Sequence, residues 1–381
     1  MALCFKLIVK CKVFSFRNYG CIARHITSAS DRSVLERSTL FIFNQKVQNF
    51  GRLNIFCDNI GVRVSSTSLW QENHATTARA FLAAKCDDEV AVSKELENIK
   101  KYFDWQVIHT EQGLSEITIK NCRSKETLLR KNVALVIEVP HSYNIFLKNA
   151  SKIPVVVEKL ENNKVEILSL GDCILSQLKS HSVKVNSESG NIVSRSSLIG
   201  DLELKTCGNG FINLRKIQGN KFEMSTEHGR VGVSSLYGTH VTISTSRGHV
   251  DIGDAHGEIE VKSQSGDICC KSLSGHLTAT TEDGNINTKL TSNASIDALS
   301  LIGNATIKLD PNLACEFRLS SKKLHISNDL HLFKSSKEAK DDENIFIGRT
   351  HDRTCEHRVN VRCPKGKIDA FQENWFNWQE L

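Results

Sequence analysis

Glycine returns at a fixed short period through the middle of the chain, and this repeat constrains the fold more than any other feature of the sequence. One series is separated by 20, 19, 19, 18 and 18 residues and consists of Gly190, Gly210, Gly229, Gly248, Gly266 and Gly284. A second series lies about halfway between its members and consists of Gly200, Gly219, Gly238, Gly257 and Gly275. Self-similarity at so short a period predicts a solenoid, in which each repeat stacks on its neighbour.

Between the glycines, apolar residues occur in pairs two positions apart. These pairs include Ile212/Leu214, Phe222/Met224, Val231/Val233, Val241/Ile243, Val250/Ile252 and Ile259/Val261. A spacing of two places both members on one face of a strand, and glycine suits the turns because it adopts a positive φ without steric cost. Two strands per 18–20 residues therefore predict an all-β, two-sheet β-solenoid whose rungs stack about 4.8 Å apart.

The two glycine series have different neighbours, which predicts two unlike edges. Two residues before the second series the side chain is apolar: Leu198, Ile217, Leu236, Ala255 and Leu273. Three residues before the first series it is small and mostly hydroxylated: Ser187, Cys207, Thr226, Thr245, Ser263 and Thr281. We expect an apolar side chain tucked under one edge and a solvated hydroxyl rim along the other.

Two other solenoids share this period but not this pattern. A left-handed hexapeptide helix needs apolar residues every six positions, whereas the pairs here recur every nine or ten. A calcium-binding nonapeptide roll needs Gly-Gly-x-Gly-x-Asp turns, which are absent. Asp201, Asp267 and Asp283 occupy non-equivalent turn positions, so we expect neither calcium nor any other cofactor.

The regular repeats of 165–310 are predicted to lie between two caps. Residues 31–164 are expected to form a mixed α/β cap that includes the first solenoid strands, at Gly51 and Gly61, and a hairpin around Gly113. Between these, Val92, Leu96, Ile99 and Phe103 recur at the spacing of an amphipathic helix.

After Pro311, residues 311–381 are predicted to form a short β cap. Within it, 334–344 is predicted to be a charged loop, and 345–347 and 359–361 are predicted strands. Trp375, Phe376 and Trp378 are expected to cover apolar surface at the end of the chain.

The first 30 residues contain no acidic residue and five basic ones: Lys6, Lys10, Lys12, Arg17 and Arg24. This composition predicts a mitochondrial transit peptide over 1–30, with the matrix favoured. A cytoplasmic or a secreted protein is the alternative, and a secretory signal would need an apolar run that the lysines do not interrupt. The Asn-x-Ser/Thr sites at Asn149, Asn293 and Asn304 matter only in the secretory case.

Charge and cysteine content exclude several classes. The formal net charge is +6, and the five basic residues of the leader account for most of it. Residues 165–310 hold 13 Lys and Arg against 16 Asp and Glu, which argues against nucleic-acid binding. No uncharged apolar stretch approaches the roughly 20 residues of a transmembrane helix. The 13 cysteines include no CxxC pair, as expected for free thiols in a reducing compartment.

Residue patterns for catalysis are missing. The sequence contains no nucleophile elbow, phosphate-binding loop, zinc-protease motif or dinucleotide fingerprint. The residue after each glycine of the first series follows no catalytic pattern: Asn191, Phe211, Arg230, His249, Asp267 and Asn285. We therefore expect no enzymatic activity.

Two groups of side chains are candidates for binding. His228 and Arg230 flank Gly229, and Arg247 and His249 flank Gly248 one rung away, so these four could form a rim for an anion or a partner. A solvated rim without a ligand is the alternative. The second group, His351, Cys355, His357 and Cys363, has ligand types that suit zinc, but its spacing matches no compact zinc module and no metal site is expected.

The half-repeats, together with the strand block that ends Ile137-Glu138-Val139-Pro140, resemble the "putative adhesin" domain over residues 47–64 and 130–310. With its leader, the chain is similar to the animal group named "family with sequence similarity 185". The resemblance implies a β-solenoid and no established active site.

The predicted function is a non-enzymatic scaffold or protein-binding module whose partner is unidentified. A carbohydrate-active or other solenoid enzyme, and a secreted adhesion protein, are the alternatives.

Overall fold

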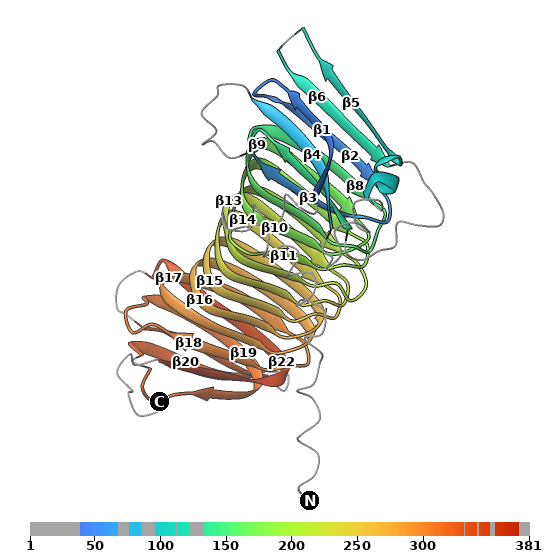
Figure 1. Ribbon diagram of the computed structural model, residues 1–381. Coiled ribbons are helices and arrows are strands. Elements are labelled where there is room, and N and C mark those ends of the chain that lie inside the picture. Colours follow the sequence, from blue (N-terminus) through green and yellow to red (C-terminus); the bar gives the residue numbers. More distant parts are fainter. Residues whose placement is uncertain are drawn as a thin grey trace, which may run out of the picture.

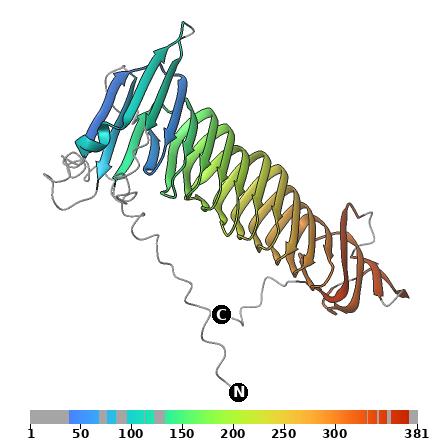
Figure 2. The same cartoon turned by 90° about the vertical axis from the view of Figure 1, so that its right-hand side faces the viewer.

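Long parallel strands, stacked one per rung, make up the middle of the chain (Figures 1 and 2). The computed structural model describes residues 39–67, 76–84, 96–111, 113–121, 133–330, 332–340, 343–350 and 355–372. The central strands are β9 (Val155–Ser169), β10 (Cys173–Ser187), β11 (Ile192–Ser194), β12 (Ser197–Thr206), β13 (Ile212–Thr226), β14 (Val231–Thr245), β15 (Val250–Ser265), β16 (Ile268–Asp283) and β17 (Ile286–Ser300). No helix within these residues is long and apolar enough to cross a membrane.

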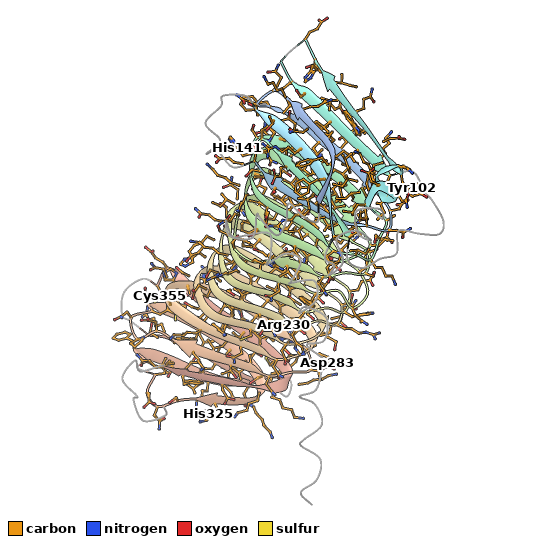
Figure 3. The ribbon with its side chains drawn as sticks, viewed as in Figure 1. Tyr102, His141, Arg230, Asp283, His325 and Cys355 are labelled. Carbon is orange, nitrogen blue, oxygen red and sulfur yellow. The ribbon has the colours of Figure 1, made fainter. Side chains whose placement is uncertain are left out.

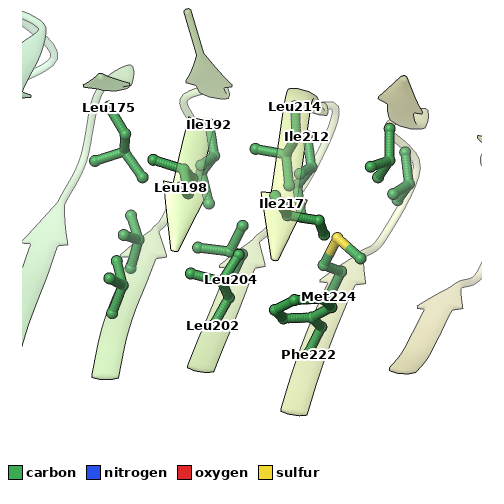
Figure 4. Close-up of a cluster of buried hydrophobic side chains, with 14 of the residues drawn as sticks. Leu175, Ile192, Leu198, Leu202, Leu204, Ile212, Leu214, Ile217, Phe222 and Met224 are labelled. Atoms are coloured by element: carbon green, nitrogen blue, oxygen red, sulfur yellow. The ribbon is translucent and has the colours of Figure 1, made fainter. Parts of the chain in front are cut away.

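Each long strand bends near its middle, and its two halves lie on opposite sides of one continuous core. In β14 the buried residues Val231 and Val233 lie in the first half, and Val241 and Ile243 lie in the second. Figure 4 shows side chains of the first halves, such as Ile212 and Leu214, facing those of the second halves, such as Phe222 and Met224, across the core. We call the sheet of first halves the first sheet and the sheet of second halves the second sheet. The predicted two-sheet solenoid is confirmed.

Equivalent residues of successive strands pair in register, so similar side chains stack on one another. Val231 lies beside Val250, which lies beside Ile268. We call the edge at which the strands bend the apolar edge. Its tucked side chains are fully buried, as predicted: Leu198, Ile217, Leu236, Ala255 and Leu273.

The opposite edge, which we call the polar edge, carries the first glycine series, and here the reason for glycine differs from the prediction. A Cβ on Gly248 would lie 1.9 Å from the carbonyl oxygen of Gly229, and one on Gly229 would lie 1.7 Å from that of Gly210. The positive φ predicted for turn glycines is present at Gly257, at 110°, but not at Gly248. Along the polar edge, glycine is mainly required because successive rungs approach too closely for a side chain.

The predicted solvated hydroxyl rim is wrong. Ser187 and Ser300 are completely buried, and their hydroxyls donate to the carbonyls of Gly171 (2.9 Å) and Gly284 (2.7 Å). In the 20-residue coil, Thr206 rather than Cys207 takes this place and donates to Gly190 (2.6 Å). These hydroxyls end their strands on the inward-facing side, where the glycine carbonyls need a donor.

The N-terminal cap pairs its strands out of sequence order. On the second sheet, β2 (Gly51–Cys57) lies between β8 (Tyr143–Asn149) and β6 (Ser115–Asn121), and β5 (Phe103–His109) lies outermost. On the first sheet, β3 (Gly61–Ser66) lies between β9 and β7 (Val133–Val139), followed by β4 (Thr77–Ala84) and β1 (Thr39–Lys46).

Apolar side chains close the core at this end. Phe43 of β1 stacks on Trp105 of β5, with ring centres 5.2 Å apart. Leu96 and Ile99 of the short helical stretch 96–100 are buried, as predicted, whereas Val92 lies outside the described residues. The predicted hairpin around Gly113 is the β5–β6 pair.

The C-terminal cap also departs from chain order. The last described strand, β22 (His357–Gln372), lies between β17 and β18 (Ala305–Leu309) on one side and β19 (Cys315–Ile326) on the other. Antiparallel β21 (Glu343–Arg349) and β20 (Lys334–Lys340) continue the sheet. The predicted charged loop is therefore wrong over 334–340 and 343–344, which are strand residues, because exposed charged residues such as Lys337 suit an edge strand. The leader 1–30 and Trp375, Phe376 and Trp378 lie outside the described residues.

The glycine contact predicts a position-specific cost. Gly248→Ala is expected to destabilise the protein by about 1–3 kcal/mol, because its Cβ would push the rungs apart. Gly232→Ala is the matched control, since its Cβ would meet no atom closer than 3.3 Å. Urea denaturation measures both, and equal midpoints for the two variants would contradict this account of the edge.

Candidate functional site

The residues that follow the polar-edge glycines form a ladder of side-chain acceptors. The backbone N–H of Asn191 donates to Asp172 Oδ1 (2.8 Å), and that of Asn285 donates to Asp267 Oδ1 (2.7 Å). The N–H of Asn304 donates in turn to Asn285 Oδ1 (3.0 Å). Each acceptor thereby satisfies an amide of the next rung. The mixed set of residues predicted to be non-catalytic has a structural role in holding the rungs together.

The ladder is interrupted where Phe211 and Arg230 follow the glycine, since neither offers an acceptor. Beside this gap lies a groove of about 350 Å³, lined among others by Arg230, His249, Asp251 and Cys269. Figure 3 marks Arg230 on the rod.

Charges in this groove are paired. Arg230 Nε lies 2.6 Å from Asp251 Oδ2. The Nδ1 of His249 accepts the backbone N–H of Asp267 at 3.1 Å, so that nitrogen carries no proton in this arrangement. The pairing of Asp251 with Arg230 was not predicted from the sequence, because the two residues lie 21 positions apart. Only the stacking of their rungs brings them together.

The four residues predicted as an anion or partner rim are thus only partly gathered. Arg230 and His249 line the groove, with Asp251 and Asp267 among its other lining residues. His228 and Arg247 are exposed and do not line it. The paired carboxylates leave this groove without a positive excess, and the rim stays a prediction.

Of the residues considered for zinc, His357 and Cys363 are not brought together. His357 and Cys363 lie six positions apart on β22, which is about 20 Å along a strand. Cys363 is completely buried, and His351 lies outside the described residues. Among the residues that the structure describes, no group of three or more His, Cys, Asp or Glu could hold a metal ion.

Core thiols lie in an environment that disfavours the thiolate. Burial raises the pKa of Cys173, Cys270 and Cys315 to about 12, and that of Cys363 to about 11. Cys269 is partly exposed, and its pKa is raised mainly by burial and also by Asp251. A raised thiol pKa opposes nucleophilic and redox chemistry at neutral pH.

A larger groove lies on the second sheet of the C-terminal cap, and we call it the cap groove. It measures about 700 Å³, and its lining includes Asp297, Glu316, Arg318, Ile347, Arg349 and Arg358. These residues come from β17, β19, β21 and β22. The cap groove was not predicted from the sequence, because the strands that line it pair out of chain order and no repeat spacing connects them.

Comparison with known proteins supplies a family. The family model for "Toastrack DUF4097" matches residues 111–340. A "putative cell adhesion protein" from Clostridium sporogenes is 12% identical, with 87% of this chain and 98% of that chain covered and a TM-score of 0.18. A "putative adhesin" from Bacteroides fragilis is 11% identical, with 87% and 96% covered and a TM-score of 0.31. A "putative lipid binding protein" from Parabacteroides distasonis is 10% identical, with 87% and 96% covered and a TM-score of 0.32.

The side-chain ladder predicts unequal effects of two substitutions on one rung. Asn285→Ala is expected to lower the free energy of unfolding by about 1–2 kcal/mol, because the N–H of Asn304 loses its acceptor. Asn287→Ala, on the exposed face two residues away, is expected to stay within about 0.5 kcal/mol of the parent. Chemical denaturation tests the pair, and the opposite ranking would refute a structural role for the ladder.

The thiols predict a labelling pattern. In native protein at pH 8, iodoacetamide is expected to modify Cys207 and Cys269 and to spare Cys173 and Cys270 until the chain unfolds. Peptide mapping by mass spectrometry distinguishes the adjacent Cys269 and Cys270. Rapid native labelling of Cys270 would contradict its inward orientation.

Proposed function

The chain belongs to the Toastrack DUF4097 family, and from that premise we propose that it is a non-enzymatic β-solenoid scaffold that binds a protein partner inside mitochondria. The proposal rests on the observation that repeated polar side chains along the polar edge bond to the neighbouring rung. The inward hydroxyls, such as Ser187, and the ladder residues, such as Asn285, hold one rung to the next. The outward-facing side chains differ from rung to rung, and these are the positions at which we expect a partner to bind.

The apolar edge supports protein binding. Ile199, Gln218, Tyr237 and His256 occupy equivalent positions on four successive rungs. The rings of Tyr237 and His256 stack 4.7 Å apart, and the Lys216 ammonium lies 5.4 Å from the tyrosine ring centre. Ile199 and Tyr237 are exposed, at 38% and 37%. An exposed tyrosine held by stacking on a neighbouring ring is typical of the residues that contribute most to protein binding.

The mitochondrial part of the proposal is supported by the acid-free, basic leader. The acceptor site at Asn149 is buried at 1% exposure and its amide donates to the carbonyl of Ile60, so glycosylation is to be tested at Asn293 and Asn304 instead. A glycan on that nitrogen has no room in the folded protein.

Partner binding through the apolar edge is testable with matched variants. We expect Tyr237→Ser to lose, after crosslinking in intact mitochondria, a protein that the parent chain recovers in stoichiometric amount. Thr242→Ala, on the outer face of the same rung, is expected to retain it. Equal recovery by both variants would refute this surface, and turnover of a polysaccharide by purified protein would refute the non-enzymatic assignment.

Localisation needs a separate experiment. Full-length chain synthesised in vitro is expected to become protease-resistant in energised mitochondria and to lose its N-terminal segment. A chain lacking residues 1–30 is expected to stay accessible to protease. Protection that is independent of the leader, or glycosylation at Asn293 or Asn304 in cells, would contradict the assignment.

A further inference from the structure

Three arginines converge in the cap groove from strands that are distant in sequence. Arg358 of β22, Glu316 of β19 and Arg349 of β21 are direct cross-strand neighbours. Arg318 lies two residues beyond Glu316 on the same face of β19. At about 4.8 Å between strands, the three arginine backbones lie within roughly 10 Å of one another, well inside the combined reach of their side chains.

None of these three arginines forms an ion pair within the described part of the chain. Arg362, on the same face of β22, shows the contrast. Its Nη2 and Nε donate to the two carboxylate oxygens of Glu343, at 2.9 and 3.3 Å. A paired arginine and three unpaired ones therefore share one sheet, and the unpaired ones are those that line the groove.

Arg349 has a further unsatisfied group. Its Nε is buried and has no hydrogen-bond partner. The guanidinium carbon lies 5.5 Å from the centre of the Phe333 ring, which limits where the side chain can turn. A buried donor without an acceptor is unfavourable, so an acceptor entering the groove would relieve it.

Carboxylates only partly offset this charge. Asp297 accepts a hydrogen bond from Asn360 Nδ2 (3.0 Å) and lies 3.4 Å from His276 Nε2, so it is already engaged with its own neighbours. Glu316 faces Arg349 and Arg358 across the strands but lies in no ion pair among the described residues. Three guanidinium groups against Asp297 and Glu316 leave an excess of one positive charge in the groove lining.

We propose that the cap groove binds a phosphate group, with Arg318, Arg349 and Arg358 as its ligands. Three guanidinium groups around one groove suit a phosphate group, because each can donate a pair of hydrogen bonds to phosphate oxygens. The hydroxyl of Ser336 and the exposed side chain of Ile347 lie on the same wall, next to Arg318 in register. This wall offers a polar and an apolar contact to the rest of the ligand. The site is separate from the apolar edge, so it stands whether or not a protein binds there.

Calorimetric titration of the whole chain with glycerol phosphate, at constant ionic strength, tests the site. Saturable binding is expected, and the double variant Arg318→Gln/Arg358→Gln is expected to weaken it at least tenfold. Arg195→Gln/Arg215→Gln removes the same charge at two exposed positions outside the groove and is expected to bind like the parent. Equal weakening by both double variants would mean that net charge alone attracts phosphate, and would overturn the proposal.

Two further measurements test whether coordination is specific and which kind of molecule supplies the phosphate. Arg349→Lys retains the charge but loses the paired donors, so a loss of affinity at an unchanged melting temperature supports specific coordination. Vesicles of phosphatidylcholine with phosphatidic acid distinguish a lipid headgroup from a soluble phosphate ester. Binding to vesicles alone assigns the site to the headgroup, binding to glycerol phosphate alone assigns it to a soluble ester, and binding to neither overturns the proposal.

Discussion

Backbone-to-backbone contact between rungs at the polar edge is the constraint on which the rest of the structure depends. A Cβ at Gly229 or Gly248 would lie less than 2 Å from the carbonyl oxygen of the glycine before it. Because the rungs approach so closely, the strands on either side stay in step. That register lets Ser187 reach the Gly171 carbonyl and lets Asp267 accept from the next rung. The packing of the core, the hydrogen bonds of the buried hydroxyls and the ladder of acceptors all depend on this stacking of the rungs.

The repeat was predictable because its causes are local. Pairs such as Val231 and Val233 indicate which strand face is buried, and Leu236 indicates the bend. Neither inference needs knowledge of a distant contact. The role of Gly248 and the direction of the hydroxyls were not predictable, because both depend on the neighbouring rung. The same holds for the grooves. Arg318, Arg349 and Arg358 belong to three strands that no periodicity connects, and only the pairing of β19 with β21 and β22 makes them neighbours.

In this Toastrack chain the surfaces proposed for binding lie apart from the groups that stabilise the rungs. Positions that recur on each rung, inside the core and along the polar edge, are occupied by groups that bond to the chain itself. Outward positions whose residue type varies between rungs, such as Tyr237 on the apolar edge, and the arginines of the cap groove carry exposed rings or unpaired charge. In a solenoid, departures from the repeat are therefore where binding is to be sought.

The position of β22 has a consequence for how the rod is assembled. The middle rungs can form one after another as the chain lengthens, because each pairs with the one before it. The C-terminal end cannot, since β19 reaches its final neighbour only when residues 357–372 have entered between it and β18. The N-terminal end has the same property, with β2 held between β6 and β8. Both ends are thus completed only after segments far apart in the chain have paired, whereas the middle rungs need only their neighbours in sequence.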